Sequence, residues 1–169
     1  MDIVHQSRLY YNSKEESQSV GGAIRTLNRN ENDIKKQRCK MAYVTCKLRS
    51  AELDRNVEIK LYFPCDLPVY VGAEMKGTLT LLHGYGNSGD DWTQMTAAAR
   101  YAADNGLVLI CPSCQNSFYQ DTFRSAWKTF VTEEMPLLLS RMFHFPRERE
   151  KNFIAGLSMG GYGALYLAF

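Results

Sequence analysis

The sequence lacks three features that would each indicate a particular class of protein. No apolar run approaches the roughly 18 residues that suggest a membrane-spanning helix. The net charge is only +2, so the strongly basic surface typical of nucleic-acid binding is missing. The first residues, MDIVHQ, lack the basic-then-apolar pattern of a secretory signal. We therefore expect a cytoplasmic protein whose partner is neither nucleic acid nor a membrane.

Cysteine is present, but its number and arrangement do not indicate a disulfide framework. The five cysteines are an odd, scattered set, which is typical of free thiols. Residues 111–114 read Cys-Pro-Ser-Cys, a spacing found in redox motifs and in zinc sites. No second such pair and no histidine pair at ligand spacing accompanies it. Because the motif follows the apolar run 107–110, we predict a structural role at a strand end, with a thiol or metal function of Cys111 and Cys114 as the weaker alternative.

Composition divides the chain into two parts. Its length suits one domain with a hydrophobic core rather than two. Residues 1–40 are polar and charged, so they cannot bury enough apolar surface to offset the entropy lost on ordering. We predict a disordered or loosely helical extension there and a folded domain over residues 41–169.

The apolar pattern of residues 41–169 predicts an α/β fold. Alternation of apolar and polar residues is typical of antiparallel strands, whereas short continuous apolar runs are typical of strands buried on both faces. The predicted antiparallel pair is 43–48 and 57–63, and the predicted buried strands are 77–82, 107–110 and 153–155.

Two helices are predicted between these strands. An aspartate at 90 or 91 caps the first, which runs on to Gly106. The second runs from about Arg124 to Phe143 and is bent by Pro136. Glu133 and Glu134 are neighbours in that helix and do not face each other, so we predict a solvated face rather than a carboxylate pair. We expect the polar and aromatic loop 117–122 to line a substrate pocket.

The most informative stretch is residues 152–163, where residues 156–160 match the pattern G-x-S-x-G. An apolar strand precedes the pattern and a helix-compatible segment follows it, which is the context of a nucleophile elbow. The crowded neighbours of a serine in such a strained turn must lack side chains, hence Gly156 and Gly160. We therefore predict Ser158 as the nucleophile, with the next helix able to stabilise an oxyanion. The alternative is an ordinary glycine-rich turn between strand and helix.

A second glycine-rich stretch, residues 83–89, directly follows the strand 77–82. Main-chain N–H groups of such a loop can supply the other half of an oxyanion hole. The stretch contains neither G-x-G-x-x-G nor a Walker lysine, so a nucleotide site is not indicated. His83 is either a catalytic base or a brace of the loop, and we predict the brace.

Four segments together resemble a known family. They are residues 81–87 (LLHGYGN), Trp92, residues 133–136 (EEMP) and residues 150–163 (EKNFIAGLSMGGYG). On these, residues 41–169 resemble the Putative esterase (esterase D-like) branch of the α/β-hydrolases, in particular bacterial tributyrin esterases and acetylesterases.

The resemblance implies a role for each matching residue. Ser158 would be the nucleophile of a serine esterase, and the main chains of Met159 and of Tyr85 or Gly86 would form the oxyanion hole. His83 and Gly84 would support the loop. The implied substrates are small esters with acetyl or butyryl groups, and no cofactor or metal is implied. Feruloyl esters and S-formylglutathione are handled by relatives with similar elbows.

The sequence departs from that family after the elbow. In α/β-hydrolases the acid and the histidine of the triad follow the serine, but this sequence ends at Phe169. We therefore expect the N-terminal portion of an α/β-hydrolase sheet, incomplete at the C-terminus, with an open strand edge and exposed apolar residues 165–169. The expected activity is impaired, and the expected partner is a missing C-terminal portion or a second copy in a homo-oligomer. The alternative is a non-catalytic fragment or pseudoenzyme.

Overall fold

The computed structural model describes residues 41–64 and 75–169. The predicted extension, residues 1–40, lies outside the described residues, as do residues 65–74. The described residues therefore cover the predicted folded domain with one internal gap.

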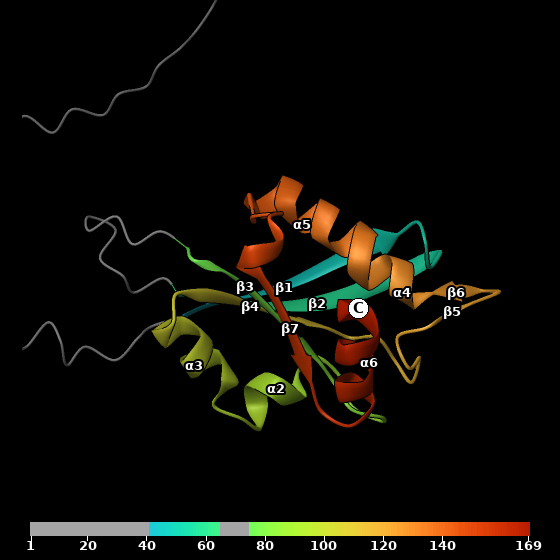
Figure 1. The fold of residues 1–169 in the computed structure, drawn as a ribbon, viewed down its shortest axis with the longest axis horizontal. Coiled ribbons are helices and arrows are strands. Elements are labelled where there is room, and N and C mark those ends of the chain that lie inside the picture. Colours follow the sequence, from blue (N-terminus) through green and yellow to red (C-terminus); the bar gives the residue numbers. More distant parts are fainter. Residues whose placement is uncertain (1–40, 65–74) are drawn as a thin grey trace, which may run out of the picture. The chain divides into compact units, whose positions relative to one another are not determined.

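The described residues contain a five-stranded mixed sheet in the order β1-β2-β4-β3-β7 (Figure 1). The strands are β1 (Met41–Ser50), β2 (Arg55–Pro64), β3 (Gly77–Leu82), β4 (Leu107–Pro112) and β7 (Asn152–Gly156). β2 pairs antiparallel with β1 and with β4, whereas β4, β3 and β7 are parallel to one another. All five predicted strands are confirmed, and so is the prediction of an antiparallel pair followed by parallel strands with helices between them.

The helices and a small hairpin connect these strands. They are α2 (Asp91–Gln94), α3 (Ala98–Asp104), the hairpin of β5 (Asp121–Thr122) and β6 (Ser125–Ala126), α4 (Trp127–Thr129), the π-helical η1 (Phe130–Glu134), α5 (Met135–Phe143), the 3-10 helix η2 (Arg149–Lys151) and α6 (Met159–Ala168). Among the described residues, no helix is both long and apolar enough to cross a bilayer.

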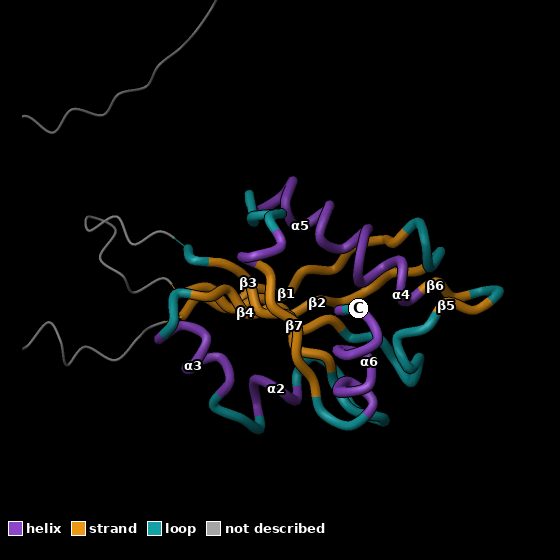
Figure 2. Tube along the Cα trace, in the orientation of Figure 1, coloured by secondary structure: helices purple, strands orange, loops and turns teal. Residues whose placement is uncertain are grey.

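The core lies on both faces of the sheet, because consecutive residues of a strand point to opposite faces. Leu82 and Val108 belong to one cluster of buried side chains, together with Met135 of α5 and Met159 of α6. Leu81 and its neighbours in β4 and α3 form the other cluster. Figure 2 accordingly shows α5 and α3 on opposite sides of the strands. α5 and α6 thus share one face of the sheet.

The prediction of one continuous first helix is wrong, because the segment forms two short helices, α2 and α3, with a break between them. The Thr96 hydroxyl donates to the Trp92 carbonyl and accepts from the N–H of Ala98 at 3.1 Å. A threonine that bonds the main chain in this way competes with regular helical bonding. The Asp90 side chain also makes no capping hydrogen bond to α2, contrary to the prediction.

The second predicted helix begins at Trp127 rather than Arg124, since residues 125–126 form β6. Pro136 is predicted to bend this helix. The helix contains the π-helical turn η1 two residues before Pro136, and there the N–H of Met135 donates to the carbonyl of Phe130. A π turn changes the bonding register beside a proline that has no N–H to donate.

Glu134 corrects the prediction of a solvated face. Its carboxylate accepts the hydroxyl of Ser50 and the N–H of Ala51, the latter at 2.7 Å. It therefore binds the turn between β1 and β2. Glu133 remains exposed, as predicted.

β7 is an edge strand, so one side of its ladder has no partner among the described residues. Phe153 of this strand is 49% exposed, and Leu165 and Phe169 beyond the elbow are also largely exposed. Both features follow the expectation from the sequence. A row of unpaired main-chain groups beside apolar side chains is a surface that favours association.

Candidate active site

β7 and α6 are joined by a tight turn at Ser158. Ser158 has φ 55° and ψ −117°, a conformation that costs a non-glycine residue roughly 1–3 kcal/mol. Its side chain is exposed. A strained, exposed serine between a strand and a helix has the geometry of a nucleophile elbow.

Two glycines let this turn lie against the neighbouring strand β3. A Cβ on Gly160 would lie 2.0 Å from the carbonyl oxygen of Leu82, and a Cβ on Gly156 would lie 2.3 Å from the main chain of Gly160. The N–H of Leu157 donates to the same Leu82 carbonyl at 3.3 Å. The glycines of G-x-S-x-G therefore fix where Ser158 stands relative to the end of β3.

The loop 83–89 begins at that strand end and passes beside the serine. A Cβ on Gly84 would lie 3.6 Å from Cβ of Ser158 and 3.5 Å from the Leu157 carbonyl oxygen. The N–H of Gly86 donates to Oδ1 of Asn116 at 2.7 Å. Of the two predicted donors in this loop, Gly86 is thus already paired, which favours Tyr85. Met159 supplies the first N–H of α6, directly after the serine.

His83 is buried at the start of this loop and is 1% exposed. Its Nε2 accepts the N–H of Cys114 at 2.9 Å, so the ring proton is on Nδ1, which lies 2.8 Å from the carbonyl oxygen of Gly84. The hydroxyl of Tyr119 donates to the His83 carbonyl at 2.7 Å. Both ring nitrogens are engaged with the main chain, so this histidine has the geometry of a brace and not of a base for Ser158.

The other histidine of the described residues is His144. It has a left-handed conformation at the C-terminus of α5, where its N–H donates to the Ser140 carbonyl at 2.9 Å. Within the described residues, the hydroxyl of Ser158 forms no hydrogen bond with a histidine or a carboxylate. Ser158 therefore stands at the turn with no general base bonded to its hydroxyl among those residues.

The segment 113–116 holds the loop 83–89 at three points. Besides the bonds from Cys114 to His83 and from Gly86 to Asn116, the N–H of Gly89 donates to Oγ of Ser113 at 3.1 Å. Sequence reasoning missed this support because the two segments lie about thirty positions apart.

The Cys-Pro-Ser-Cys motif belongs to this support. Cys111 and Cys114 are both fully buried and both free thiols. Burial, with a smaller effect of Asp90, raises the pKa of Cys111 to about 12, and burial also raises the pKa of Cys114. Buried, protonated thiols are poor nucleophiles and poor metal ligands. The described residues hold no cluster of side chains suited to a metal ion.

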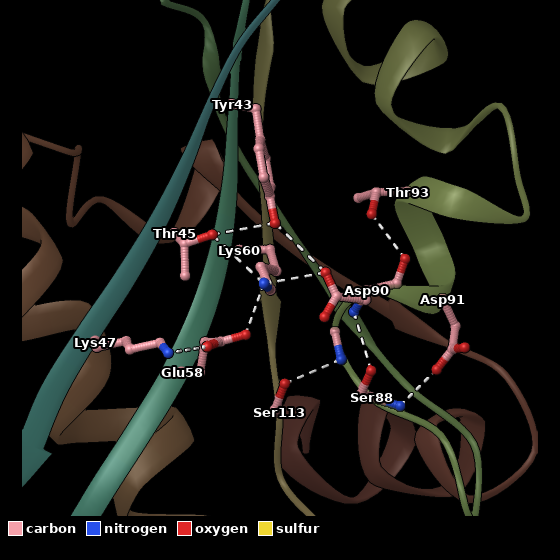
Figure 3. A network of polar contacts seen from close by, with 11 residues as sticks. Tyr43, Thr45, Lys47, Glu58, Lys60, Ser88, Asp90, Asp91, Thr93 and Ser113 are labelled. Carbon is pink, nitrogen blue, oxygen red and sulfur yellow. Dashed lines mark hydrogen bonds and ion pairs between the residues drawn. The ribbon is translucent and has the colours of Figure 1, made fainter.

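A buried lysine anchors the far end of the loop, as Figure 3 shows. Nζ of Lys60 in β2 lies 2.6 Å from Oε1 of Glu58 and 3.1 Å from Oδ1 of Asp90, and its side chain is 10% exposed. Tyr43 of β1 donates to the same Asp90 oxygen at 3.4 Å. Burial alone would lower the pKa of Lys60, but the hydrogen bonds to Glu58, Tyr43 and Asp90 outweigh it and raise that pKa.

Asp90 therefore faces the sheet instead of capping α2. Asp91 binds the loop itself, since its carboxylate accepts the N–H of Ser88 at 2.5 Å. Part of the Lys60 ion-pair cluster could have been predicted from the sequence, because Glu58 and Lys60 are two positions apart in a strand and therefore share a face. Their partner Asp90 could not be found by periodicity.

Two cavities lie next to these elements. The smaller, of about 120 Å³, is lined by His83, Gly84, Asn87, Asp91, Trp92, Met95, Thr96 and Leu157. The larger, of about 470 Å³, is polar and is lined by Gln115, Asn116, Ser117, Gln120, Thr122, Ser125 and Trp127. Three residues of the predicted pocket loop 117–122 thus line a cavity, and Gln120 also donates to the Tyr162 hydroxyl of α6 at 2.7 Å.

Residues 50–169 match the family described as Putative esterase. Among curated proteins, an acetyl esterase of Caldicellulosiruptor saccharolyticus is 36% identical over 132 residues, which are 74% of this chain and 50% of that protein. The chain spans about half the length of this relative.

Solved structures show the same fold. The fluorophosphonate-binding serine hydrolase FphF of Staphylococcus aureus, in a substrate-bound structure, aligns with TM-score 0.67 and 27% identity over 76% of this chain and 51% of that one. An S-formylglutathione hydrolase of the same organism, FrmB, aligns with TM-score 0.64 and 27% identity over 76% of this chain and 52% of that one. A ferulic acid esterase at 20% identity and TM-score 0.61 supports the fold alone.

Proposed function

The chain belongs to the Putative esterase family, and on that premise we propose that it carries the nucleophile and oxyanion hole of a serine carboxylic-ester hydrolase. The carrying observation is Ser158, exposed at φ 55° between β7 and α6 with Gly84 beside it. In this proposal Ser158 Oγ attacks the ester carbonyl carbon, and the developing oxyanion accepts hydrogen bonds from the N–H groups of Met159 and Tyr85.

The chemistry then needs a base that receives the serine proton and returns it to the leaving alcohol. His83 cannot serve, because both of its ring nitrogens already bond the main chain. We propose that the acid and the histidine come from a further portion of the protein or from another chain, in the order Ser, acid, His typical of the fold. An oxyanion hole and binding alone retain roughly 10³–10⁴-fold rate enhancement over water in a well-formed enzyme.

The proposed substrates are small esters with short acyl chains, acetyl or butyryl. The 36%-identical relative is an acetyl esterase, which supports an acetyl group. The likeness to an S-formylglutathione hydrolase at 27% identity supports a thioester of formate as the second candidate substrate. No cofactor takes part in this proposal.

The second candidate function is non-catalytic, as a fragment or pseudoenzyme that acts by association. The open edge of β7 and the exposed Phe153 and Leu165 favour it. It differs from the first proposal in one measurable respect, because Ser158 would then have no chemical role.

Chemical rescue separates the two functions. Residues 1–169 are assayed with p-nitrophenyl acetate and butyrate, with and without added imidazole as an external base. If the protein is an esterase, imidazole should raise the hydrolysis rate of the unmodified protein. At the same imidazole concentration, that rate should exceed the rate of Ser158→Ala. Ser140→Ala, a serine of α5, is the matched control and should behave as the unmodified protein. Equal rates in all three proteins, at every imidazole concentration, would leave the non-catalytic function.

A further inference from the structure

The loop 83–89 has a β-turn at its tip, formed by residues 84–87. The N–H of Asn87 donates to the carbonyl of Gly84 at 3.2 Å, which closes the turn. Gly86, the second central residue, has φ 78°, whereas φ of Tyr85, the first central residue, is not positive. A positive φ at the second central position alone defines a type II turn. The peptide between Tyr85 and Gly86 therefore has the type II orientation.

The residues of the turn do not fix this orientation by themselves. Type I and type II turns differ in their central peptide, which rotates by about 150–170° between the two while the ends of the turn stay in place. Glycine adopts positive and negative φ about equally readily, so Gly86 permits both turns. A contact from outside the turn can therefore decide between them.

Asn116 supplies such a contact. Its Oδ1 accepts the N–H of Gly86 at 2.7 Å, and this is the N–H that the rotation of the central peptide would turn away. The same segment makes a second contact with the tip, because the ring centroids of Phe118 and Tyr85 lie 6.1 Å apart. The tip of the loop is thus held from the segment 115–119 as well as by its own turn.

The main chain of the segment 115–119 is strained. Three of its residues have positive φ, between 52° and 57°, namely Gln115, Phe118 and Tyr119. Strained main chain persists only where the surrounding contacts over-determine it, and it is concentrated at functional sites. Tyr119 makes such a contact, since its buried side chain donates to the His83 carbonyl at 2.7 Å. The strained segment is therefore tied to the start of the loop while Asn116 bonds the tip.

We propose that Asn116 is a positioning residue for the oxyanion hole. By holding the Gly86 N–H, its Oδ1 keeps the central peptide in the type II orientation and the adjoining Tyr85 N–H in place next to Gly84, whose added Cβ would lie 3.6 Å from Cβ of Ser158. Tyr85, and not Gly86, is then the donor of the loop. The inference rests on the proposed function, since it acts through an N–H that would bind the oxyanion.

The role of Asn116 has a kinetic consequence. Donors that are held in place stabilise a developing charge without rearranging during the reaction. If the turn exchanges between types I and II, only part of the molecules hold the donor in the right place. Loss of the Asn116 oxygen should therefore weaken transition-state stabilisation and leave substrate binding unchanged.

The turn is tested by NMR in ¹⁵N-labelled protein with assigned amide signals. A type II turn gives a strong nuclear Overhauser effect (NOE) between Hα of Tyr85 and the amide proton of Gly86, whereas a type I turn gives one between the two amide protons. The unmodified protein should show the first NOE. Asn116→Leu, which nearly keeps the shape of asparagine without its acceptor, should add the second. Asn116→Asp keeps an acceptor oxygen and should show the first alone.

Kinetics test the effect on the reaction, with p-nitrophenyl acetate at a fixed imidazole concentration. The Ser158-dependent kcat of Asn116→Leu should fall about two- to tenfold, as expected for one neutral hydrogen bond. KM should stay unchanged, because the interaction is made only in the transition state. A mere loss of stability would lower the urea midpoint but not the kcat of the folded protein.

Gln115→Leu is the matched control. Gln115 lines the same cavity as Asn116, but its side chain accepts a hydrogen bond from Arg55 at 2.7 Å and makes none with the loop 83–89. This variant should keep the NOE pattern, kcat and KM of the unmodified protein.

The outcomes separate this inference from the proposed function. An unchanged NOE pattern in Asn116→Leu, an unchanged or raised kcat, or an effect confined to KM would overturn the positioning role, while hydrolysis that depends on Ser158 would remain. If the unmodified protein shows no Ser158-dependent hydrolysis at any imidazole concentration, the esterase chemistry is rejected and the positioning role with it.

Discussion

Replacing Gly160 by alanine should destabilise the protein strongly, whereas the same change at Gly161 should not. Both glycines lie in the first turn of α6. At Gly160 the new Cβ would meet the Leu82 carbonyl oxygen at 2.0 Å and the His83 carbonyl oxygen at 2.8 Å. At Gly161 the nearest neighbour is the Gly156 carbonyl oxygen at 3.4 Å, an ordinary contact. Comparing the two variants therefore measures the effect of the close contact between the Ser158 turn and the strand β3 alone.

The magnitude can be worked from these distances. Alanine favours a helix over glycine by up to about 1 kcal/mol, and this gain should appear at Gly161. At Gly160 an ordinary contact of about 3.5 Å would require a main-chain movement of about 1.5 Å, because the obstacle is a carbonyl in a paired strand and not a flexible side chain. Overpacking of this kind costs about 1–3 kcal/mol and occasionally more. We expect the two variants to differ by about 1–4 kcal/mol in free energy of unfolding.

Urea unfolding followed by tryptophan fluorescence measures the difference, with equal m values as the check that both variants unfold from comparable states. The Gly160→Ala midpoint should fall and the Gly161→Ala midpoint should stay or rise. Equal midpoints would show that the elbow does not lie against Leu82 and His83, which would remove the basis for placing the loop 83–89 beside Ser158.

Three further predictions concern the parts around the site. Lys60→Met should lower the free energy of unfolding by about 2–4 kcal/mol, because it leaves the partly buried carboxylate of Asp90 without a cationic partner and leaves Glu58 with the exposed Lys47 alone. Lys47→Met, whose side chain is 73% exposed, should cost at most about 1 kcal/mol, and similar urea midpoints for the two variants would contradict this. In the folded protein at pH 8, iodoacetamide should modify the half-buried Cys46 before it modifies the buried Cys111 and Cys114, and peptide mass spectrometry measures this order. Rapid modification of Cys111 and Cys114 would instead support a thiol function for this pair. The free energy of unfolding should decline above pH 9.0, the ordinary thiol pKa, because burial raises the pKa of Cys111 and Cys114 in the folded state and the unfolded chain therefore loses these protons first. The slope is up to about 1.4 kcal/mol per pH unit for each thiol. Urea titrations at pH 8 to 10.5 measure this slope, and Cys114→Ala should reduce it.

The strands could be predicted from the sequence because their signal is local. The run 77–82 coincides with β3, and 107–110 and 153–155 lie inside β4 and β7. A strand buried on both faces must be apolar along its length, so a run of consecutive apolar residues is enough to predict it. The helices were less predictable, because Thr96 breaks one by a side-chain hydrogen bond that competes with apolar periodicity.

The candidate site divides in the same way. Ser158 and its two glycines could be predicted because the steric demand of the turn falls on adjacent residues. The supports of the loop 83–89 could not, since each joins segments far apart in the chain, as Lys60 joins Asp90 and Asn116 joins Gly86. Periodicity states which face a residue occupies but not which distant residue faces it.

These supports also separate the position of the proposed nucleophile, Ser158, from the supply of a base for it. Every contact that places Ser158 and the loop 83–89 comes from described residues, namely the end of β3, the segment 113–116 and Lys60 of β2. The two basic groups among these contacts are already engaged, since the His83 ring accepts the N–H of Cys114 and the Asp90 carboxylate pairs with Lys60, and neither bonds the Ser158 hydroxyl. Positioning and electrostatic stabilisation can thus be complete while proton transfer is absent. A small external base should then restore the missing step, because it needs access to an exposed hydroxyl and no rearrangement of the elbow.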